Sequence, residues 1–481
     1  MPVLKQRKEY NFIGKCKRID SKYLVVNQSG AFVVLSPEEH NSLMTHRMGD
    51  ELFSELEAKN IIVTDNNFER VVEDYKLKKA NLFQGTSLHI VVPTLRCNQK
   101  CVYCHAASVP QDAKGYDMDK ETASKVVDFI SQSPSKAITI EFQGGEPLLN
   151  FAIVQHIVEY AKNLNKTHKK DVRFTIVTNL TLMNQNILNY LIKQEIGICT
   201  SFDGPKYVHD KNRKFLDGRG TYDEVVKWIK AIQKSKYKGM NALMTVTRYS
   251  LPYYKEIVDE YANLGLKRIW FRYLNNLGFA QEAWKEVGYS AEEFIEFWKK
   301  GVDYIYSKDF QKNMMREISS LILTIKVLRK HDPNFLDLQS PCGAAIGQLA
   351  YRYDGNIYSC DEGRMVKDDF FKLGNVHEDT YKSLFSSSKT CSLIASSVND
   401  TYLCDACIYQ PYCGVCPVLS YINTQNIVPK LAQDFRCKIL KAQFEHVFKK
   451  IISEKGFREY MEKFEVFKEP VKKKKHGKNK K

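Results

Sequence analysis

Three cysteines, Cys97, Cys101 and Cys104, fall within eight residues and are spaced Cys-x3-Cys-x2-Cys. An iron–sulfur cubane that only carries electrons has a cysteine thiolate on each of its four irons. A loop with three thiolates leaves the fourth iron open to a small chelating ligand, so chemistry can occur there. Tyr103 can lay its aromatic face over such a cluster and limit the access of water. The alternatives are a zinc site, with His105 as the nearby fourth ligand, and a chance group of buried thiols.

The cysteine loop resembles the signature of the radical S-adenosylmethionine (SAM) enzymes. In that family the amino and carboxylate groups of SAM chelate the open iron of a [4Fe–4S] cluster. An injected electron then splits the sulfonium, and the resulting 5′-deoxyadenosyl radical takes a hydrogen atom from the substrate. The resemblance implies that Cys97, Cys101 and Cys104 are metal ligands and that a [4Fe–4S] cluster and SAM are the cofactors.

A glycine-rich turn, Gly144-Gly145-Glu146-Pro147, follows the second predicted strand. Glycines let a backbone approach a ligand closely. The turn resembles the GGEP motif of the same family, in which the backbone and the glutamate hold the amino group of SAM through a charge-assisted contact. The resemblance implies that these four residues bind the cofactor. Read alone, the motif is a plain Gly-Gly turn.

Short polar side chains lie where two further predicted strands end. Thr178 and Asn179 end the third strand, and Ser201 and Asp203 lie at the end of the fourth. Such groups can hydrogen-bond a ribose or the methionine carboxylate, because barrel enzymes bind ligands at the carboxyl ends of their strands. Ser201 and Asp203 can equally be cap and turn residues. We take all four as candidate cofactor-binding residues.

The segment that starts at Asp203 resembles the DGPxxxHDxxR stretch of the maturase branch of the family, typified by anaerobic sulfatase maturases. It contains His209 and Arg213, and both are read as structural rather than catalytic residues. Arg272, in the sixth predicted strand, is a candidate partner for a carboxylate.

Alternating strands and amphipathic helices from about residue 87 to 275 are typical of parallel βα units. Six such units predict an α/β fold, a partial (βα)6 TIM barrel that is open on one side. The cysteine loop follows the first strand, at the end where barrels place their active sites. The predicted strands are 88–92, 137–142, 172–177, 197–202, 242–246 and 269–274, and clear helical patterns lie at 122–130, 152–164 and 254–264.

Residues 1 to about 80 predict a small α+β unit. Ser36, Pro37 and Glu39 form a capping box that starts a helix. The unit resembles the winged-helix leader-recognition elements of peptide-modifying enzymes, in which a precursor peptide adds a strand to an exposed sheet edge. The alternative is a small packing domain with no ligand. The predicted elements are a hairpin of strands 23–26 and 32–35, the helix after Ser36, a helix at 51–59 and a strand at 61–63.

Seven of the eight cysteines that follow the barrel are spaced in a pattern that resembles the SPASM extension of radical SAM enzymes. By this resemblance one auxiliary [4Fe–4S] cluster is held by Cys404, Cys407, Cys413 and Cys437. A second auxiliary cluster is held by Cys342, Cys360 and Cys416 and lacks a fourth obvious cysteine.

The cysteine pattern departs from the usual extension at one point. Two residues separate Cys413 from Cys416, where the family has three. An open or non-cysteine position at the second auxiliary cluster is therefore one alternative. A zinc ribbon is another, since two Cys-x2-Cys pairs also suit zinc.

Asp361 directly follows Cys360. In sulfatase maturases an aspartate at the matching place takes the proton of the substrate side chain as its carbon is oxidised. The resemblance therefore implies that Asp361 is a catalytic base. The alternative is a turn residue that stabilises its loop.

A chain of 481 residues exceeds one hydrophobic core, so several domains are expected. The helical segment between the barrel and the cysteine-rich region should bury Phe294, Trp298, Val302 and Ile305 on one face. We predict a leader-peptide-recognition-like domain at 1–80, a radical SAM core barrel at 85–280, a helical connector at 281–337 and a SPASM auxiliary iron–sulfur domain at 338–440. The last segment, 441–481, holds the C-terminal helix, which should cover about 438–467, and the basic tail.

The net charge of +16 is concentrated in residues 471–481, which carry seven lysines. Without them the excess is +9, so the charge does not indicate a nucleic-acid substrate. No apolar run reaches the length of a membrane span, and the first residues lack a secretory signal. Thirteen cysteines without such a signal indicate metal or redox chemistry in a reducing compartment, so we expect a cytoplasmic protein.

Within the radical SAM/SPASM class, the N-terminal hairpin unit and the segments 142–150, 242–247 and 409–417 are most similar to the His-Xaa-Ser system maturases. This similarity implies that the substrate is a ribosomally made precursor peptide, that a flavodoxin or ferredoxin supplies the electron, and that a second radical SAM maturase is a partner. One alternative is an anaerobic sulfatase-type maturase that oxidises a Cys or Ser of a folded protein. A non-enzymatic alternative is a zinc-ribbon nucleic-acid-binding protein that uses the basic tail.

Overall fold

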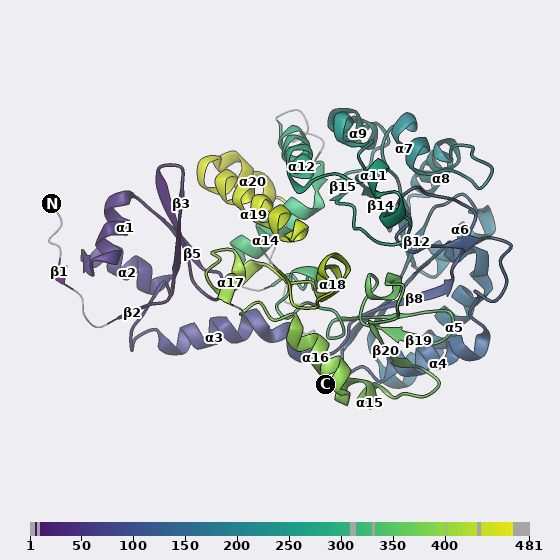
Figure 1. Ribbon diagram of the computed structural model, residues 1–481, viewed down its shortest axis with the longest axis horizontal. Coiled ribbons are helices and arrows are strands. Elements are labelled where there is room, and N and C mark those ends of the chain that lie inside the picture. The colour runs from purple at the N-terminus through teal and green to yellow at the C-terminus, as the bar shows by residue number, and fades with distance from the viewer. Residues whose placement is uncertain are drawn as a thin grey trace, which may run out of the picture.

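The computed structural model describes residues 5–6, 10–307, 314–329, 332–400, 402–430 and 434–464. The lysine-rich segment 471–481 lies outside the described residues. Figure 1 shows a small N-terminal unit at the left of the view and a larger half of strands and helices at the right. Several helices and part of the cysteine-rich region lie between them.

A nine-stranded sheet forms the centre of the larger half (Figure 1). Six of its strands are parallel and follow one another in chain order, which confirms the predicted α/β fold with a sheet consistent with a partial barrel. They are β8 (Leu88–Thr94), β11 (Ala137–Gly144), β12 (Asp171–Thr178), β13 (Gly197–Ser201), β14 (Met240–Thr245) and β16 (Phe271–Arg272).

Helices cover the outer face of this sheet because their apolar residues recur at helical spacing. These helices are α4 (Lys120–Ser131), α5 (Phe151–His168), α6 (Gln185–Lys193), α7 (Lys206–Asn212), α8 (Tyr222–Lys234) and α9 (Tyr254–Asn263). Val154 and Ile157 of α5, Ile229 of α8 and Ile257 of α9 are fully buried, so their side chains join the core against the strands.

The sixth predicted strand, 269–274, is broken into two short pieces. β15 (Arg268–Ile269) pairs with β17 (Arg316–Glu317), whereas β16 pairs with β14. The buried carboxylate of Glu317 accepts a hydrogen bond from the Phe271 backbone N–H at 3.3 Å and also caps the helix α14 (Ile318–Leu328). This contact replaces a strand hydrogen bond, which explains why one continuous strand does not form.

The cysteine-rich region adds three strands to the sheet that the sequence did not predict. β18 (Gln348–Tyr351) runs parallel to β8 on its free side, and β19 (Asn356–Tyr358) and β20 (Lys372–Asn375) follow as antiparallel neighbours. His89 on β8 ties the two regions together, since its Nδ1 lies 2.8 Å from the Tyr351 hydroxyl and its Nε2 lies 3.2 Å from the Thr86 carbonyl oxygen. The loop after β19, with Cys360, is thereby fixed beside the barrel.

The N-terminal unit has a hydrophobic cluster of its own, which includes Val25, Leu35, Leu43 and Leu56. The predicted capping box is present, since Ser36 Oγ accepts from the Glu39 N–H at 3.1 Å and the Glu39 carboxylate accepts from the Ser36 N–H. The elements are an antiparallel sheet of β3 (Lys15–Ile19), β4 (Lys22–Val26) and β5 (Phe32–Leu35), the helices α1 (Pro37–Met44), α2 (Asp50–Ala58) and α3 (Phe68–Lys79), and the short pairs β2 (Asn11–Phe12) with β7 (Ile62–Val63) and β1 (Lys5–Gln6) with β6 (Arg47–Met48).

Four helices pack together, and the longest of them contacts the N-terminal unit. They are α14, α12 (Ala291–Ile305), α19 (Phe435–Ser453) and α20 (Lys455–Glu462). In place of the single predicted C-terminal helix, 438–467, the described residues up to 464 form two helices that meet at Glu454, and residues 465–467 lie outside the described part. The four residues predicted to be buried on one face of α12 are buried. Phe448 of α19 packs edge-on against Phe32 of β5, and Glu445 of α19 pairs with Lys17 of β3 at 2.6 Å.

Shorter elements complete the described chain. They are β9 (Arg96–Cys97), β10 (Val109–Pro110), α10 (Phe279–Glu282), α11 (Trp284–Val287), α15 (Tyr381–Ser386), α16 (Ser388–Ser396), α17 (Tyr402–Asp405), α18 (Pro417–Thr424) and the 3-10 helices η1 (Ala80–Phe83), η2 (Pro147–Asn150), η3 (Leu251–Tyr253), η4 (Leu336–Leu338), η5 (Gly363–Met365) and η6 (Gln410–Tyr412). None of the helices in the described ranges is both long and apolar enough to cross a membrane.

His89 should make part of the folding free energy depend on pH. Burial lowers the pKa of its ring to about 3, whereas an unfolded histidine has a pKa of about 6.5. The unfolded state therefore takes up a proton below pH 6.5, and the folded state loses about 1.4 kcal/mol of stability per pH unit between these values. We expect His89→Gln to show a smaller loss of unfolding free energy between pH 7 and pH 5, measured by denaturant titration.

Tyr351→Phe is the matched control for this measurement. It removes the hydroxyl that contacts His89 and keeps the histidine, so it should lower stability at every pH without flattening the pH dependence. An equal slope in wild type and His89→Gln would show that His89 contributes nothing to acid sensitivity.

Candidate active site

The cysteine loop lies at the carboxyl end of β8 and is fixed by hydrogen bonds of its own backbone. The Lys100 N–H donates to the Lys214 carbonyl oxygen at 2.8 Å, and the Val102 N–H donates to that of Asn212 at 3.0 Å. Cys97 is buried, and Cys101 and Cys104 are half-buried. Burial, and then the nearby Cys101 and Glu146, raise the pKa of the Cys97 thiol. The three predicted ligands therefore share one side of the barrel mouth.

A buried ion pair lies directly beneath this loop. Arg213 Nε donates to Asp203 Oδ2 at 3.0 Å, the Tyr103 hydroxyl donates to the same oxygen at 2.8 Å, and the guanidinium of Arg213 reaches Cys101 Sγ at 3.7 Å. The other carboxylate oxygen of Asp203 accepts from the Thr245 N–H at 3.2 Å. Both oxygens of Asp203 thus hold the loop and the next strand in place, which is a structural role of the kind that the sequence left open beside cofactor binding.

His209 extends the same network away from the cysteines. Its Nδ1 accepts from the Asp203 N–H at 3.2 Å, and its Nε2 lies 3.1 Å from the Thr221 hydroxyl. The ring is fully buried, and burial together with Arg213 lowers its pKa well below the usual value. A neutral ring with both nitrogens engaged is a structural element of the strand end.

The turn at Gly144 and Gly145 packs against the backbone of the cysteine loop. The Gly145 N–H donates to the Thr94 carbonyl oxygen at 3.0 Å, and the Glu146 N–H donates to that of Arg96 at 2.8 Å. A Cβ at Gly145 would lie 2.2 Å from the Arg96 oxygen, and Gly144 has a φ of +132°. The glycines therefore allow two loops to touch, in addition to any approach of a ligand.

Glu146 joins the glycine turn to the end of β12. Its carboxylate accepts from the Thr178 hydroxyl at 2.7 Å, from the Asn179 N–H at 2.8 Å and from the Leu148 N–H at 3.1 Å. Burial raises its pKa to about 7. These contacts place the predicted residues Glu146, Pro147, Thr178 and Asn179 side by side, and Glu146 orients its neighbours through contacts within the protein.

Three further polar residues lie at this site, of which Asn98 was not predicted from the sequence. The amide of Asn179 donates to Asn98 Oδ1 at 3.0 Å and lies 3.9 Å from Cys97 Sγ, so Asn98 belongs to the site. His105 Nε2 is buried and has no hydrogen-bond partner in the described part of the chain. Burial lowers the pKa of His105 to about 3. Ser201, at the end of β13, is half-buried on the same edge of the sheet.

The residues present fit an iron–sulfur cluster with an added chelating ligand. Three cysteines face neutral amides and one arginine, which can donate to thiolates and sulfides. An unpartnered imidazole nitrogen can serve a ligand placed at the same mouth. No three His, Cys, Asp or Glu side chains among the described residues converge closely enough to enclose a single metal ion.

The seven cysteines of the downstream pattern line two cavities. One cavity is lined by five of these cysteines, at positions 404, 407, 413, 416 and 437. Burial, and after it the nearby thiols of Cys437, Cys407 and Cys404, raises the pKa of Cys413 to about 12. The other is lined by Cys342, Cys360 and Cys416. Burial raises the pKa of Cys416 to about 11. Cys416 lines both cavities, and the two cavities together are lined by the seven cysteines for which the resemblance implied two auxiliary clusters.

Asp361 and its neighbour Glu362 lie between the barrel and the second cavity. The guanidinium of Arg364 contacts Asp361 Oδ1 twice. Its Nε donates a hydrogen bond at 2.8 Å, and its Nη2 lies 2.7 Å from the same oxygen. Arg272, from β16, pairs with Glu362 at 3.6 Å, and Glu362 lines the cavity of the three cysteines. The candidate base Asp361 is thus held by an arginine, while the carboxylate next to it faces the cysteines.

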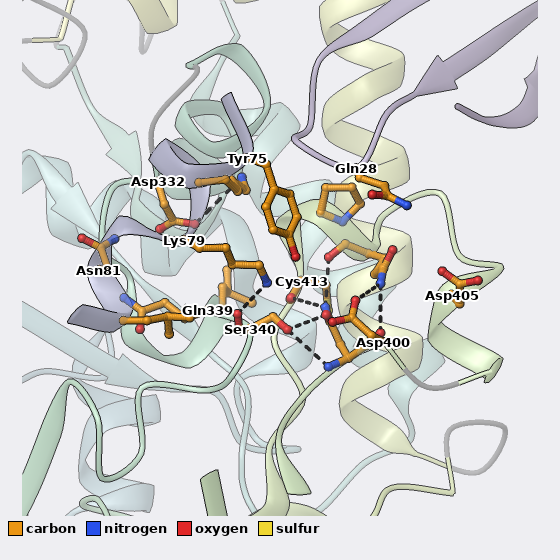
Figure 2. A pocket seen from close by; sticks show the side chains of 16 residues that line it. Gln28, Tyr75, Lys79, Asn81, Asp332, Gln339, Ser340, Asp400, Asp405 and Cys413 are labelled. Atoms are coloured by element: carbon orange, nitrogen blue, oxygen red, sulfur yellow. Dashed lines mark hydrogen bonds and ion pairs between the residues drawn. The ribbon is translucent and has the colours of Figure 1, made fainter. Parts of the chain in front are cut away.

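A further pocket of about 260 Å³ lies where the N-terminal hairpin, α3 and the cysteine-rich region meet. Figure 2 shows Gln28 and Tyr75 on one side and Ser340, Asp400 and Cys413 on the other. Lys79 Nζ donates to the Ser340 carbonyl oxygen at 2.7 Å. The pocket therefore connects the N-terminal unit to the wall of the cavity that holds Cys413.

Comparisons with known proteins agree with this geometry. Residues 91–261 match the model of the radical SAM superfamily. The chain is 26% identical over 379 residues to a cysteine-type anaerobic sulfatase-maturating enzyme of Clostridium perfringens, which covers 76% of this chain and 97% of that protein. It is also 24% identical over 413 residues to the antilisterial bacteriocin subtilosin biosynthesis protein AlbA of Bacillus subtilis. That alignment covers 83% of this chain and 82% of AlbA.

Solved structures show the same fold. The structure of hexahistidine-tagged anSMEcpe with bound AdoMet matches with a TM-score of 0.65 at 22% identity, over 76% of this chain and 94% of that chain. The structure of Streptococcus suis SuiB bound to precursor peptide SuiA matches with a TM-score of 0.52 at 15% identity. The match covers 88% of this chain and 98% of the SuiB chain.

Gly145→Ala should displace the cysteine loop. The added Cβ would meet two backbone oxygens, those of Arg96 at 2.2 Å and Leu95 at 2.5 Å, and neither can move without the loop. We expect the variant to lose the iron of one cluster, about four atoms per chain, in an iron and sulfide assay. Gly456→Ala is the control because nothing lies within 4 Å of its added Cβ. Full iron content in Gly145→Ala would show that this close contact is dispensable.

Asp203→Asn should leave Arg213 buried without its counter-charge. Removal of one member of a buried pair costs about 3–5 kcal/mol, and the two side chains are 0% and 10% exposed. The double variant Asp203→Asn/Arg213→Met removes both charges and should be more stable than the additive sum of the two single variants. Denaturant unfolding of the wild type, the two single variants and the double variant gives the coupling free energy between the two side chains. If the changes in unfolding free energy of the single variants add up to that of the double variant within about 0.5 kcal/mol, the ion pair does not stabilise the fold.

Proposed function

We propose that this chain, which carries a radical SAM domain and is related to sulfatase maturases and peptide maturases, modifies a ribosomally made precursor peptide of the His-Xaa-Ser type. The observation that carries the proposal is the N-terminal unit beside the cysteine-rich region. A [4Fe–4S] cluster and SAM are the cofactors of such an enzyme, as the cysteine loop predicted. The enzyme relatives favour this reading over a zinc-ribbon nucleic-acid-binding protein.

The proposed roles of the core residues follow from their placement. Cys97, Cys101 and Cys104 would hold the cluster, and the polar strand ends from Glu146 to Asn179 would position SAM. When bound, these groups supply the 5′-deoxyadenosyl radical that removes a hydrogen atom from the substrate. Tyr103 is 4% exposed and hydrogen-bonded to Asp203, so it closes the loop against water.

The N-terminal unit is the proposed site of leader recognition. The order β3-β4-β5 leaves one edge of β3 and one edge of β5 without a strand partner among the described residues. A peptide can add a strand at such an edge, where main-chain hydrogen bonds give affinity. Gln28, in the hairpin turn before β5, lines the pocket that continues to Cys413, so a peptide bound at this sheet has a path toward the cysteine-rich region (Figure 2).

The proposed auxiliary clusters and base complete the assignment. The cysteines 404, 407, 413 and 437 would hold one cluster and Cys342, Cys360 and Cys416 the other, as acceptors of the electron that substrate oxidation leaves behind. Asp361 would take the substrate proton, after its pair with Arg364 opens. A flavodoxin or ferredoxin as electron donor, a second radical SAM maturase as partner, and the five domain boundaries set out above belong to the same proposal.

A sulfatase-type maturase is the second candidate. The similarity to cysteine-type and serine-type anaerobic sulfatase-maturating enzymes favours it, since the cysteine-type relative is covered over 97% of its length. Its substrate would be a Cys or Ser in a protein rather than a leader-bearing peptide. Such a reaction has no use for the sheet edges of the N-terminal unit.

Formation of 5′-deoxyadenosine separates the two candidates. Anaerobically reconstituted protein with SAM and a reductant should form it faster with a His-Xaa-Ser precursor peptide than with the same peptide lacking its leader, or with a sulfatase peptide. Cys101→Ala should abolish the product, whereas Cys391→Ala, an exposed cysteine on α16, should not. Equal stimulation with and without a leader would contradict leader recognition, and stimulation by the sulfatase peptide alone would select the second candidate.

A further inference from the structure

The cavity around Cys342, Cys360 and Cys416 contains three thiols, one fewer than a fully thiolate-bound cubane needs. The cysteines outside the cluster sets lie elsewhere, since Cys16 is exposed on β3, Cys391 is exposed on α16, and Cys199 is on β13 inside the barrel. Two carboxylates, those of Asp337 and Glu362, line the same cavity. A fourth protein ligand from within this cavity can therefore be a carboxylate.

We propose that the carboxylate of Asp337 is the fourth ligand of the iron–sulfur cluster held by Cys342, Cys360 and Cys416. The inference rests on the auxiliary clusters of the proposed function and adds to them a residue of this chain. Ligands other than cysteine do occur in iron–sulfur proteins, as the histidines of Rieske centres show. Carboxylate oxygen is also a common ligand of protein-bound iron.

The backbone holds Asp337 rigidly beside the cysteines. Asp337 lies in the one-turn helix η4, and the Gly343 N–H, next to Cys342, donates to the Leu336 carbonyl oxygen at 2.7 Å. Gly414, between Cys413 and Cys416, packs so closely that a Cβ there would lie 2.6 Å from the Asp337 carbonyl oxygen. The backbone of Asp337 is thus tied to the loops of two of the three cysteines.

The two carboxylates differ in their partners. Glu362 is already paired with Arg272 at 3.6 Å. The side chain of Asp337 has no hydrogen bond or ion pair to any residue that the structure describes, although its main-chain oxygen accepts from Arg436 Nη2. An acidic side chain that lines a thiol cavity without a partner is available to a metal, and Asp337 is the one in this position.

Arg436 supplies a matching positive charge. It lines both cysteine cavities, is 8% exposed, and its Nε has no acceptor in the described part of the chain. A carboxylate ligand carries the same single negative charge as the missing thiolate, so the arginine balances the cluster in either case. The unused Nε–H can donate to a cluster sulfur or to a ligand atom of either cavity.

Mössbauer spectroscopy tests the ligand directly. The parent is the full chain with Cys97→Ala, Cys101→Ala and Cys104→Ala, reconstituted with ⁵⁷Fe, so that only auxiliary clusters remain. We expect one iron subsite of one cluster to show the larger isomer shift of an oxygen ligand. Asp337→Cys should convert this subsite to the all-thiolate type. Asp337→Ala should lose that iron on mild oxidation and give the EPR signal of a [3Fe–4S] cluster.

Glu362→Gln is the matched control, because it removes the other carboxylate of the cavity and should leave the distinct subsite unchanged. Loss of this subsite in Glu362→Gln but not in Asp337→Ala would overturn the assignment, and so would parent spectra that Asp337→Cys does not change. Asp337→Cys keeps a ligand, so it separates ligand loss from misfolding. A parent that binds zinc and no iron would refute the auxiliary clusters themselves, whereas two clusters insensitive to Asp337 would refute only this inference.

Discussion

The contact between the glycine turn and the cysteine loop is the constraint on which the candidate site depends. The backbone of Gly144 and Gly145 lies so close to the carbonyl oxygens of residues 94–96 that no side chain fits between them. This contact fixes the cysteine loop of β8 against the turn of β11. Glu146 then continues the connection to the end of β12 through Thr178 and Asn179. The loops that follow these adjacent parallel strands therefore form one packed unit. The way the strands are paired fixes where a ligand can bind between the loops.

The arrangement of charge under the loop serves the same end. Asp203 at the end of β13 uses both oxygens on groups of the protein, and Arg213 is left with one face toward Cys101. A buried arginine without a carboxylate would be costly, and a carboxylate beside thiolates would repel them. Placed together, the two leave a net positive edge toward the sulfur atoms. The pair therefore both orders the loop and favours the deprotonated cysteines that a cluster requires.

The sequence predicted the parallel barrel strands and the cysteine groups because apolar runs and metal-ligand spacing are local signals. It did not predict β18 beside β8, since that pairing joins residues 260 positions apart through main-chain hydrogen bonds and a buried contact of His89 with Tyr351. The broken sixth strand depends on Glu317, a distant residue that no pattern around 269–274 reveals. Likewise the sequence leaves Asp203 open as either a ligand contact or a cap or turn residue at a strand end, and only the fold shows that both of its oxygens are engaged within the protein.

Each cysteine group has an arginine beside it, buried for Arg213 and Arg436 and half-buried for Arg272, and each arginine is held by an oxygen of the protein. Arg213 is held by Asp203, Arg272 by Glu362 and Arg436 by the Asp337 carbonyl oxygen. Burial raises the pKa of the thiols Cys97, Cys101, Cys342 and Cys360, so binding a cluster must release protons from groups that resist losing them. Fixed cations offset that resistance without themselves giving up a proton, because arginine stays charged when buried. Lysine could not serve as well, since burial lowers the pKa of Lys78 in the neighbouring pocket to about 7.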